Sequence, residues 1–376
     1  MTMIPNSSAK KSVFFENLDG LRAIAALAVI FYHMSLWFAF PNEAIYIYLK
    51  KIFSFGRVGG SLGVTFFFIL SGFLITYLLF IEQENNNKIN VSKFYMRRVL
   101  RIWPLYYLTV FIGFVIYPLL FELSGDVYKE TGNLFLYMVF GANFDPIYLK
   151  GSHNPILGVQ WSVAIEEQFY LIWPLLFVFF IRVRSFSFYL LTIIILSELF
   201  TNFSNTWPVK YYHLFSNIKY LAFGALIAVF CYNKKEVIVE KFSRIPKILN
   251  LIIYLTCMTL LFNQAQINIL LPNYKFVFNM IAMSFFGYVL IDQNFSINSF
   301  FKIGKFKLLS WLGKISYGLY LNHMIAISVI ISIFPKDETF LLTKFSLTLV
   351  ITILISHLSH KYYESFFINL KNKFST

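Results

Sequence analysis

Charged residues are scarce in this sequence of 376 residues. Asp, Glu, Lys and Arg together make up 13% of it, about half of the share that is usual in soluble domains. Hydrophobic residues make up 58%, and no stretch is polar enough to form a separate water-soluble domain. These two facts exclude an ordinary soluble globular protein. They predict a single membrane-embedded domain over residues 1–376, with no appended soluble domain.

Cysteine is nearly absent too, and so are several motifs of well-known enzymes. Cys231 and Cys257 both lie in or beside apolar segments, so they indicate neither a disulfide framework nor a metal site. The sequence contains no P-loop, no GxSxG elbow, no Cys or His spacing for a metal and no dinucleotide fingerprint. We therefore expect no bound metal, and neither an ATP-driven pump, a serine hydrolase nor a zinc enzyme.

Acidic residues are the rarer of the two charge types: 18 Asp and Glu stand against 32 Lys and Arg, for a net charge of +14. Such an excess is also typical of nucleic-acid-binding proteins. Here, however, the basic residues form short clusters between apolar segments, as membrane proteins require for their orientation. We therefore expect a lipid bilayer and no nucleic acid among the partners.

Long apolar runs are abundant. Runs of about 17–25 apolar residues span the hydrocarbon core, and ten candidates begin near residues 20, 61, 101, 161, 186, 213, 248, 274, 310 and 339. This pattern predicts an all-α, polytopic membrane bundle of about ten transmembrane helices. The stretch 134–142 is too short to span and is expected to lie at the surface or to re-enter. Lys and Arg concentrate in the segments that would be inside if the N-terminus is inside, which predicts two cytoplasmic termini.

The first predicted helix, in "LDGLRAIAALAVIFYH" (18–33), carries Arg22 and His33. Eleven residues make about three helical turns, so both side chains project from one face, roughly 16 Å apart. A guanidinium suits phosphate, and a buried imidazole can take a proton from a hydroxyl. The pair therefore predicts an anionic ligand held at the surface with its reactive end deep in the membrane, and Asp19 is expected to position Arg22. Taken singly, each residue also has a simpler explanation: Arg22 as an anchor at the membrane surface and His33 as a buried packing residue.

A second basic element stands in "FYMRRVLRIWPLYY" (94–107). Arg98 and Arg101, three residues apart, share one face at the expected start of the third helix. Trp103 and Tyr106 are expected to mark the membrane interface. An interfacial anchor explains this element alone; together with Arg22, three guanidiniums predict a site for a polyanionic, nucleotide-bearing donor.

Two adjacent carboxylates, Glu166 and Glu167, lie in "VQWSVAIEEQFYLIWP" (159–174). Neighbouring residues of a helix point about 100° apart, so only one of them is expected to face the bundle interior. Glu166 shares a polar stripe with Ser162 and Tyr170, four residues to either side. Intramembrane carboxylates are functional by default; a shallow, hydrated position is the alternative.

Two further elements are weaker signals. Ser71 and Gly72, inside an apolar helix, permit either close helix packing or a ligand cavity. His323 is a second intramembrane histidine, preceded by Tyr317 and Tyr320. It either lines an acceptor pocket or is a hydrogen-bonded core residue.

Five segments occur in an order and at spacings that resemble the acyltransferase-3 family of integral membrane acyltransferases: "LDGLRAIAALAVIFYH", "GVTFFFILSGFLI", "FYMRRVLRIWPLYYL", "WSVAIEEQFYLIWP" and "SYGLYLNH". The resemblance implies a ten-helix bundle that moves acyl groups onto hydroxyls of sugars in cell-surface glycans or secreted metabolites. The acyl group implied is most often acetyl, taken from acetyl-CoA. Near the C-terminus the family has a glutamate before a proline-phenylalanine pair; here Glu364 is present and Phe366 replaces the proline.

Residues and resemblance together predict a membrane O-acyltransferase of a bacterial inner membrane. It would move an acetyl group from acetyl-CoA to a sugar hydroxyl of a cell-surface glycan, such as O-antigen or another lipid-linked polysaccharide. We expect catalytic roles for His33, Glu166 and Arg22, with Glu166 nearer the outer side. Donor binding is expected from Arg98, Arg101, Arg22 and Ser71. Acceptor binding is expected from Asp19, Trp161, Ser162, Tyr317 and His323.

Two other functions fit parts of the sequence. A secondary transporter or flippase for a glycan precursor would use the intramembrane His and Glu as proton relays. It leaves the inner arginines unexplained, and the sequence shows no inverted repeat. A scaffold subunit of a surface-polysaccharide complex is the third possibility.

Overall fold

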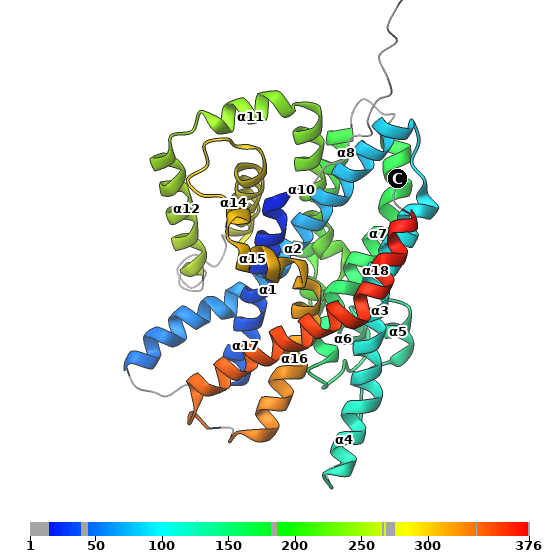
Figure 1. The fold of residues 1–376 in the computed structure, drawn as a ribbon, viewed down its shortest axis with the longest axis vertical. Helices are drawn as coiled ribbons and strands as arrows, with labels where there is room; N and C mark the ends of the chain where they lie inside the picture. Colours follow the sequence, from blue (N-terminus) through cyan, green and yellow to red (C-terminus); the bar gives the residue numbers. More distant parts are fainter. Residues whose placement is uncertain are drawn as a thin grey trace, which may run out of the picture.

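The computed structural model describes residues 15–38, 44–125, 127–181, 186–264, 267, 275–335 and 337–374, without the side chains of 44–59, 275 and 372 (Figure 1). Over these residues the chain forms helices and no strand. The longer helices are α1 (Glu16–Trp37), α2 (Ala44–Asn86), α3 (Val91–Phe111), α7 (Gln160–Phe180), α8 (Phe186–Phe203), α10 (Leu214–Asn233), α12 (Lys247–Phe262), α14 (Lys275–Phe295), α16 (Ser316–Ile333) and α17 (Leu341–Leu358). The shorter ones are α4 (Tyr117–Leu123), α5 (Leu134–Met138), α6 (Asp145–Tyr148), α9 (Trp207–Tyr212), α11 (Lys235–Ser243), α15 (Lys307–Lys314) and α18 (Ser365–Lys371).

Several of these helices join into longer spans. A π-helical turn at Ile112–Ile116 connects α3 to α4, and another at Ser359–Glu364 connects α17 to α18. Nine helices of the described chain are long and apolar enough to cross a membrane, and a tenth is added if α11 and α12, bent by 93°, count together. The predicted all-α bundle of about ten transmembrane helices is confirmed, and the protein is an integral membrane protein.

The arrangement of α12 and α14 supports the tenth crossing. Asn250 and Tyr254, on successive turns of α12, both donate to the carboxylate of Asp292 near the end of α14 (2.7 and 3.0 Å). Just beyond α14, the Asn298 amide donates to the backbone oxygen of Ser243, which precedes α12 (2.9 Å). The two helices are therefore antiparallel, and α14 returns to the end of the bundle from which α12 starts.

Both ends of the described chain lie at one end of the bundle, where α11 lies across it (Figure 1). The Phe15 ring packs against Tyr77, late in α2 (centroids 5.1 Å apart). The backbone oxygen of Phe374 accepts a hydrogen bond from Arg97, which also pairs with Glu82 of α2 (2.7 Å). Two ends on one side require an even number of crossings, which agrees with ten. That this side is the cytoplasm stays a prediction.

The third helix begins earlier than the sequence predicted. We expected its start near residue 101, but α3 starts at Val91, where the side chain of Asn90 accepts from the backbone N–H of Lys93 (2.9 Å). Asn is a favoured residue at this capping position. Arg98 and Arg101 therefore lie about 10 and 15 Å along the helix, inside the bundle, rather than at its surface.

The short stretch at 134–142 does not span, as predicted. Its only helix in the described chain, α5, has five residues. The hydroxyls of Tyr106 and Tyr107 on α3 donate to the backbone oxygens of Tyr137 and Met138 (both 2.8 Å). These bonds hold the stretch against the C-terminal half of α3. Tyr106 is thus fully buried and does not mark the membrane interface, contrary to our expectation.

A buried ion pair joins α8 to α10. The Lys219 ammonium lies 2.5 Å from a carboxylate oxygen of Glu198, and the two side chains are 1% and 8% exposed. Thr201 also accepts from Lys219 at 3.3 Å. The charges of Lys219 and Glu198 inside the bundle thus compensate each other directly, which lowers the cost of burying them at membrane depth.

Helices α2 and α10 pack against each other through glycines. A Cβ on Gly72 would overlap the backbone of Leu221, and a Cβ on Gly224 would overlap the backbone of Ile69. Small residues are what permits backbones to approach this closely in membranes. The close packing predicted from the Ser71–Gly72 pair is therefore confirmed, and Ser71, one position earlier, faces elsewhere.

We expect Gly72→Ala to destabilise the protein by about 1–3 kcal/mol, because the backbone of Leu221 leaves no room for the added methyl group. The measurement is the melting temperature of the purified protein in detergent. Gly158→Ala is the matched control, since a Cβ at Gly158 meets nothing within 4 Å. A Gly72→Ala protein that melts with the control would contradict the close packing.

Candidate active site

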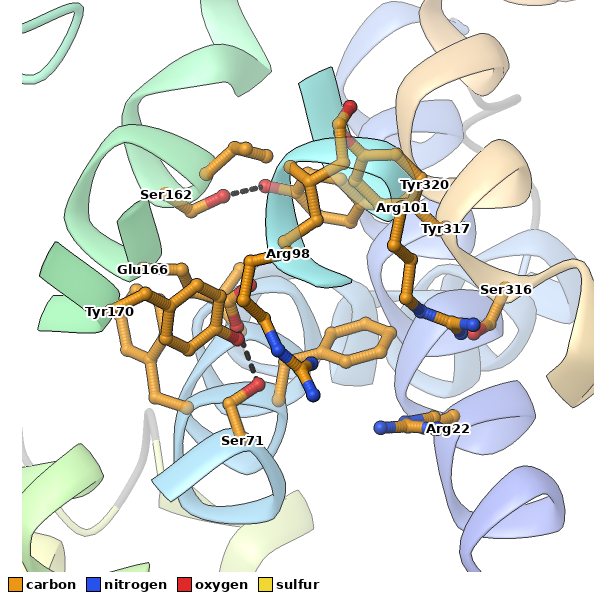
Figure 2. Close-up of a pocket in the computed structure, with 15 residues that line it drawn as sticks. Arg22, Ser71, Arg98, Arg101, Ser162, Glu166, Tyr170, Ser316, Tyr317 and Tyr320 are labelled. Atoms are coloured by element: carbon orange, nitrogen blue, oxygen red, sulfur yellow. Dashed lines mark hydrogen bonds between the residues drawn. The ribbon is translucent and has the colours of Figure 1, made fainter. Parts of the chain in front are cut away.

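A cavity of about 90 Å³ lies inside the bundle, between α1, α2, α3, α7 and α16. Its polar lining consists of Arg22, Ser71, Arg98, Arg101, Ser162, Glu166, Tyr170, Ser316, Tyr317 and Tyr320 (Figure 2). The volume suffices for several water-sized groups. Five helices, the first three of the chain together with α7 and α16, thus bring most of the predicted site residues together.

Positive charge dominates this cavity. Arg22 from α1 meets Arg98 and Arg101 from α3, and Glu166 is the only carboxylate among the lining residues. Figure 2 shows the three guanidiniums pointing into the same space. Arg22 has Asp19 beside it at 3.7 Å, as its position three residues earlier predicted. Three cations against one lining anion leave the cavity with an excess of positive charge, which suits a polyanion.

Aromatic rings hold Arg98 in place. Its guanidinium lies 5.6 Å from the ring centre of Phe94 and 5.9 Å from that of Tyr170, within the range of cation–π attraction. Its Nε atom is buried and has no hydrogen-bond partner in the described part of the chain. A buried donor without a partner is costly, so a ligand that accepts from this Nε–H would be stabilised here.

Glu166 lies among the arginines. The hydroxyl of Ser71 donates to its carboxylate at 2.8 Å, and both residues line the cavity with Arg22 and Arg98. We expected Glu166 nearer the outer side, beside the acceptor. The structure instead places it at the cavity that holds the arginines, because α7 passes directly beside Ser71 of α2.

Glu167 also faces a neighbouring helix, so the expectation that only one of the two carboxylates faces inward is wrong. Its Oε2 atom accepts a hydrogen bond from the indole N–H of Trp103 on α3 (2.8 Å). Its other oxygen is buried without a partner among the described residues. Because α7 has α2 on one side and α3 on another, two residues 100° apart both find a helix to contact. Trp103 itself is only partly buried, and its place at the membrane interface stays a prediction.

His33 lies outside the lining of the cavity and pairs with the second intramembrane histidine. Its Nδ1 atom is 3.0 Å from Nε2 of His323 on α16, and their ring centres are 4.9 Å apart. Arg22 and His33 both face α16, as their eleven-residue spacing predicted. His323 is completely buried, so it does not line an acceptor pocket; it is the hydrogen-bonded core residue that was the alternative.

Tyr320 connects the cavity to the histidine pair. Its hydroxyl lies 2.5 Å from the Ser162 hydroxyl in the cavity lining (Figure 2), while its backbone oxygen contacts Nδ1 of His323 at 2.6 Å. One turn earlier, Tyr317 lines the cavity and donates to the backbone oxygen of Ile102 (2.9 Å). Helix α16 thus contributes to both halves of the site.

Other residues lie differently from the prediction, or were missed. Trp161 does not line the cavity; its ring packs against Tyr211 and Tyr212, at 5.0 and 5.3 Å. Ser316 and Tyr170 do line it and were not predicted as ligand-binding residues. The polar stripe through Ser162, Glu166 and Tyr170 was the available signal for Tyr170. No group of three or more His, Cys, Asp and Glu suited to a metal occurs among the described residues.

Comparison with known proteins gives the family. A family model described as an acyltransferase domain matches residues 15–360. The chain belongs to this acyltransferase family. The match includes the cavity, the three arginines and both histidines, so the site described here is part of the family's shared domain.

The curated relatives are bacterial enzymes. Peptidoglycan O-acetyltransferase OatA of Listeria monocytogenes is 29% identical over 327 residues, 82% of this chain and 49% of that protein. O-acetyltransferase OatA of Staphylococcus aureus is 31% identical over 175 residues, 45% of this chain and 26% of that protein. The chain thus spans half or less of the length of these relatives. No solved structure matches it.

We expect Glu166→Gln to lower the melting temperature of the ligand-free acyltransferase, since the three guanidiniums lose the only carboxylate in their cavity. Gln keeps an acceptor for the Ser71 hydroxyl. The loss of folding stability, roughly 1–3 kcal/mol, would therefore be due to the missing negative charge. Inorganic pyrophosphate should raise the melting temperature of this variant more than that of the wild type. Glu240→Gln, at an exposed ion pair with Arg244, is the control. A variant as stable as the wild type would show that Glu166 does not balance the arginines.

Proposed function

We propose that this protein is a membrane O-acetyltransferase that moves an acetyl group from acetyl-CoA to a sugar hydroxyl of a cell-surface glycan. The observation that carries the proposal is the cavity in which three arginines face one carboxylate. Acetyl-CoA carries a diphosphate and a further phosphate, and guanidiniums are suited to such groups. Family membership and the names of the relatives support acyl transfer.

The size of the cavity suggests how the donor binds. A space of about 90 Å³ excludes a whole CoA molecule. The adenosine part would therefore remain outside the cavity, with the phosphates reaching Arg98, Arg101 and Arg22, while the narrow pantetheine arm enters. The thioester would then lie beyond the arginines and Glu166, toward Tyr320 and His33, and the low dielectric of the interior strengthens the contacts between the arginines and the phosphates.

His33 is the group we propose for the chemical step. It removes the proton from the acceptor hydroxyl while the hydroxyl oxygen bonds to the acetyl carbonyl carbon. The carbon–sulfur bond breaks, and the departing CoA sulfur takes the proton from His33. In a two-step form of the same reaction, His33 itself carries the acetyl group between donor and acceptor. Tyr320 links the two places, since its hydroxyl contacts Ser162 beside the cavity and its backbone oxygen contacts His323, the partner of His33.

The position of His33 along α1 suggests a reaction with two sides. His33 stands seventeen residues after Glu16, the first residue of α1, and so about 25 Å along that helix. Donor and acceptor would therefore enter from opposite faces, acetyl-CoA from the cytoplasm and the glycan from outside. The relatives are named for peptidoglycan; O-antigen or another lipid-linked polysaccharide of an inner membrane is the acceptor we propose to test beside it.

His33→Ala should reduce acetyl transfer by about 10²–10⁴-fold, the usual contribution of a general base. The assay follows radiolabelled acetyl groups from acetyl-CoA to membrane glycans, with the purified protein in liposomes. His153→Ala removes an exposed histidine and should retain full activity. Full activity in His33→Ala would disprove the mechanism. Flux of glycan across the liposome without acetyl-CoA would favour the transporter instead.

Arg98→Gln and Arg101→Gln should each raise KM for acetyl-CoA by about 10- to 100-fold, because a charged hydrogen bond to phosphate is worth roughly 1.5–3 kcal/mol. The value of kcat should change much less. The control is Arg244→Gln, whose side chain is exposed in its pair with Glu240 on α11. Unchanged KM values in both cavity variants would show that the arginines are not part of the donor site.

Mass spectrometry of peptidoglycan and lipid-linked glycans, with and without the gene, identifies the acceptor.

A further inference from the structure

The two histidines, 290 residues apart in the chain, form a connected pair of hydrogen bonds. The Nδ1 atom of His33 is 3.0 Å from the backbone oxygen of Val29 and 3.0 Å from Nε2 of His323. The Nδ1 atom of His323 is in turn 2.6 Å from the backbone oxygen of Tyr320. Among the described residues, every ring nitrogen in this series except Nε2 of His33 thus has a partner.

These contacts determine where the protons are. A backbone oxygen only accepts, so Nδ1 of His323 carries the hydrogen that it shares with Tyr320. In a neutral ring, Nε2 of His323 is then the acceptor. By the same argument Nδ1 of His33 carries a hydrogen, which it donates to Val29 and to His323. The remaining nitrogen of a neutral His33, Nε2, therefore has a free lone pair.

Burial separates the roles of the two rings. His323 is fully buried, with 0% of its surface exposed, while His33 is partly exposed. His323 cannot touch a substrate in this arrangement, whereas His33 can. The two backbone oxygens that the rings contact also lie inside the bundle, because Val29 of α1 and Tyr320 of α16 are buried residues.

We propose that His323 is a positioning residue that fixes His33 in the tautomer whose Nε2 atom reacts. This inference rests on the proposed function and names the reacting atom within it. Nε2 of His33 accepts the proton of the acceptor hydroxyl and later returns it to the departing CoA sulfur. While His33 holds that proton, its Nδ1–H donates a charge-assisted hydrogen bond to Nε2 of His323, which stabilises the imidazolium. An orienting partner on the other ring nitrogen is a general device for histidine.

The first test observes the tautomer directly. Protein labelled with ¹⁵N-histidine is placed in lipid nanodiscs at neutral pH, and the two residues are assigned from the spectra of His33→Gln and His323→Gln. We expect an unprotonated Nε2 on His33 and a ¹⁵N–¹⁵N coupling across the hydrogen bond from Nδ1 of His33 to Nε2 of His323. A protonated Nε2 on His33, or no coupling, would overturn the proposal.

The second test is kinetic. His323→Leu removes the acceptor and should lower kcat by about 10- to 100-fold, as loss of an outer-shell partner does for metal-bound histidines. KM for acetyl-CoA should stay within about twofold, since His323 does not line the cavity. His323→Gln restores a side-chain oxygen that accepts from His33, and should recover most of kcat.

Asn322→Leu is the matched control, since it removes a neighbouring buried polar side chain that instead contacts Ser356 of α17 (3.4 Å). We expect a kcat near that of the wild type. Equal losses in His323→Leu, His323→Gln and Asn322→Leu would reduce His323 to a packing residue.

The two tests separate this inference from the proposed function. The NMR experiment needs no donor, so absence of transfer from acetyl-CoA would overturn the function while leaving the tautomer result standing. Conversely, a wild-type protein that transfers acetyl groups and shows no coupling between the histidines would retain the function and lose the role of His323.

Discussion

Three guanidiniums share one cavity within a membrane bundle, and the rest of the site is arranged around this repulsion. Like charges repel strongly where the dielectric is low, and a lone charge at membrane depth is costly. The chain therefore surrounds the arginines with compensation: Glu166 held by Ser71, Asp19 beside Arg22, and two aromatic rings beside Arg98. The lining that remains carries more positive than negative charge.

Helix α16 then connects the charged part of the site to the reactive part. On successive turns it presents Tyr317 to the cavity, Tyr320 to Ser162 and His323 to His33. A helix offers such a series of side chains at fixed spacing, so the distance from the cavity lining to the imidazole is set by backbone geometry. Close glycine packing of α2 against α10 keeps the opposite wall equally fixed.

The parts of this architecture that depend on local sequence were predictable. Apolar run lengths predicted about ten crossings, the eleven-residue spacing placed Arg22 and His33 on one face, and Ser71–Gly72 indicated close packing. These are properties of one helix at a time. The start of α3 was wrong because Asn90 caps the helix within a polar stretch, ahead of the apolar run on which the prediction relied. Local capping chemistry overrode hydropathy there.

What depends on neighbouring helices could not be predicted from one sequence. Whether Glu167 meets solvent, lipid or Trp103 depends on which helix lies beside α7, and no periodicity contains that information. The pairing of His33 with His323 joins residues 290 positions apart. The same holds for Trp161, which packs on the tyrosines of α9 instead of facing the cavity.

The ion pair between Lys219 and Glu198 has a consequence for the insertion of the protein into the membrane during its synthesis. A lone lysine at the centre of a helix raises the cost of membrane insertion by about 2.5–3.5 kcal/mol. Because α8 precedes α10 along the chain, the carboxylate of Glu198 is already synthesised when Lys219 leaves the ribosome. The two helices, separated by the short α9, can enter the bilayer together as a hairpin whose charges cancel. Order of synthesis thereby becomes part of the reason why a lysine is tolerated there.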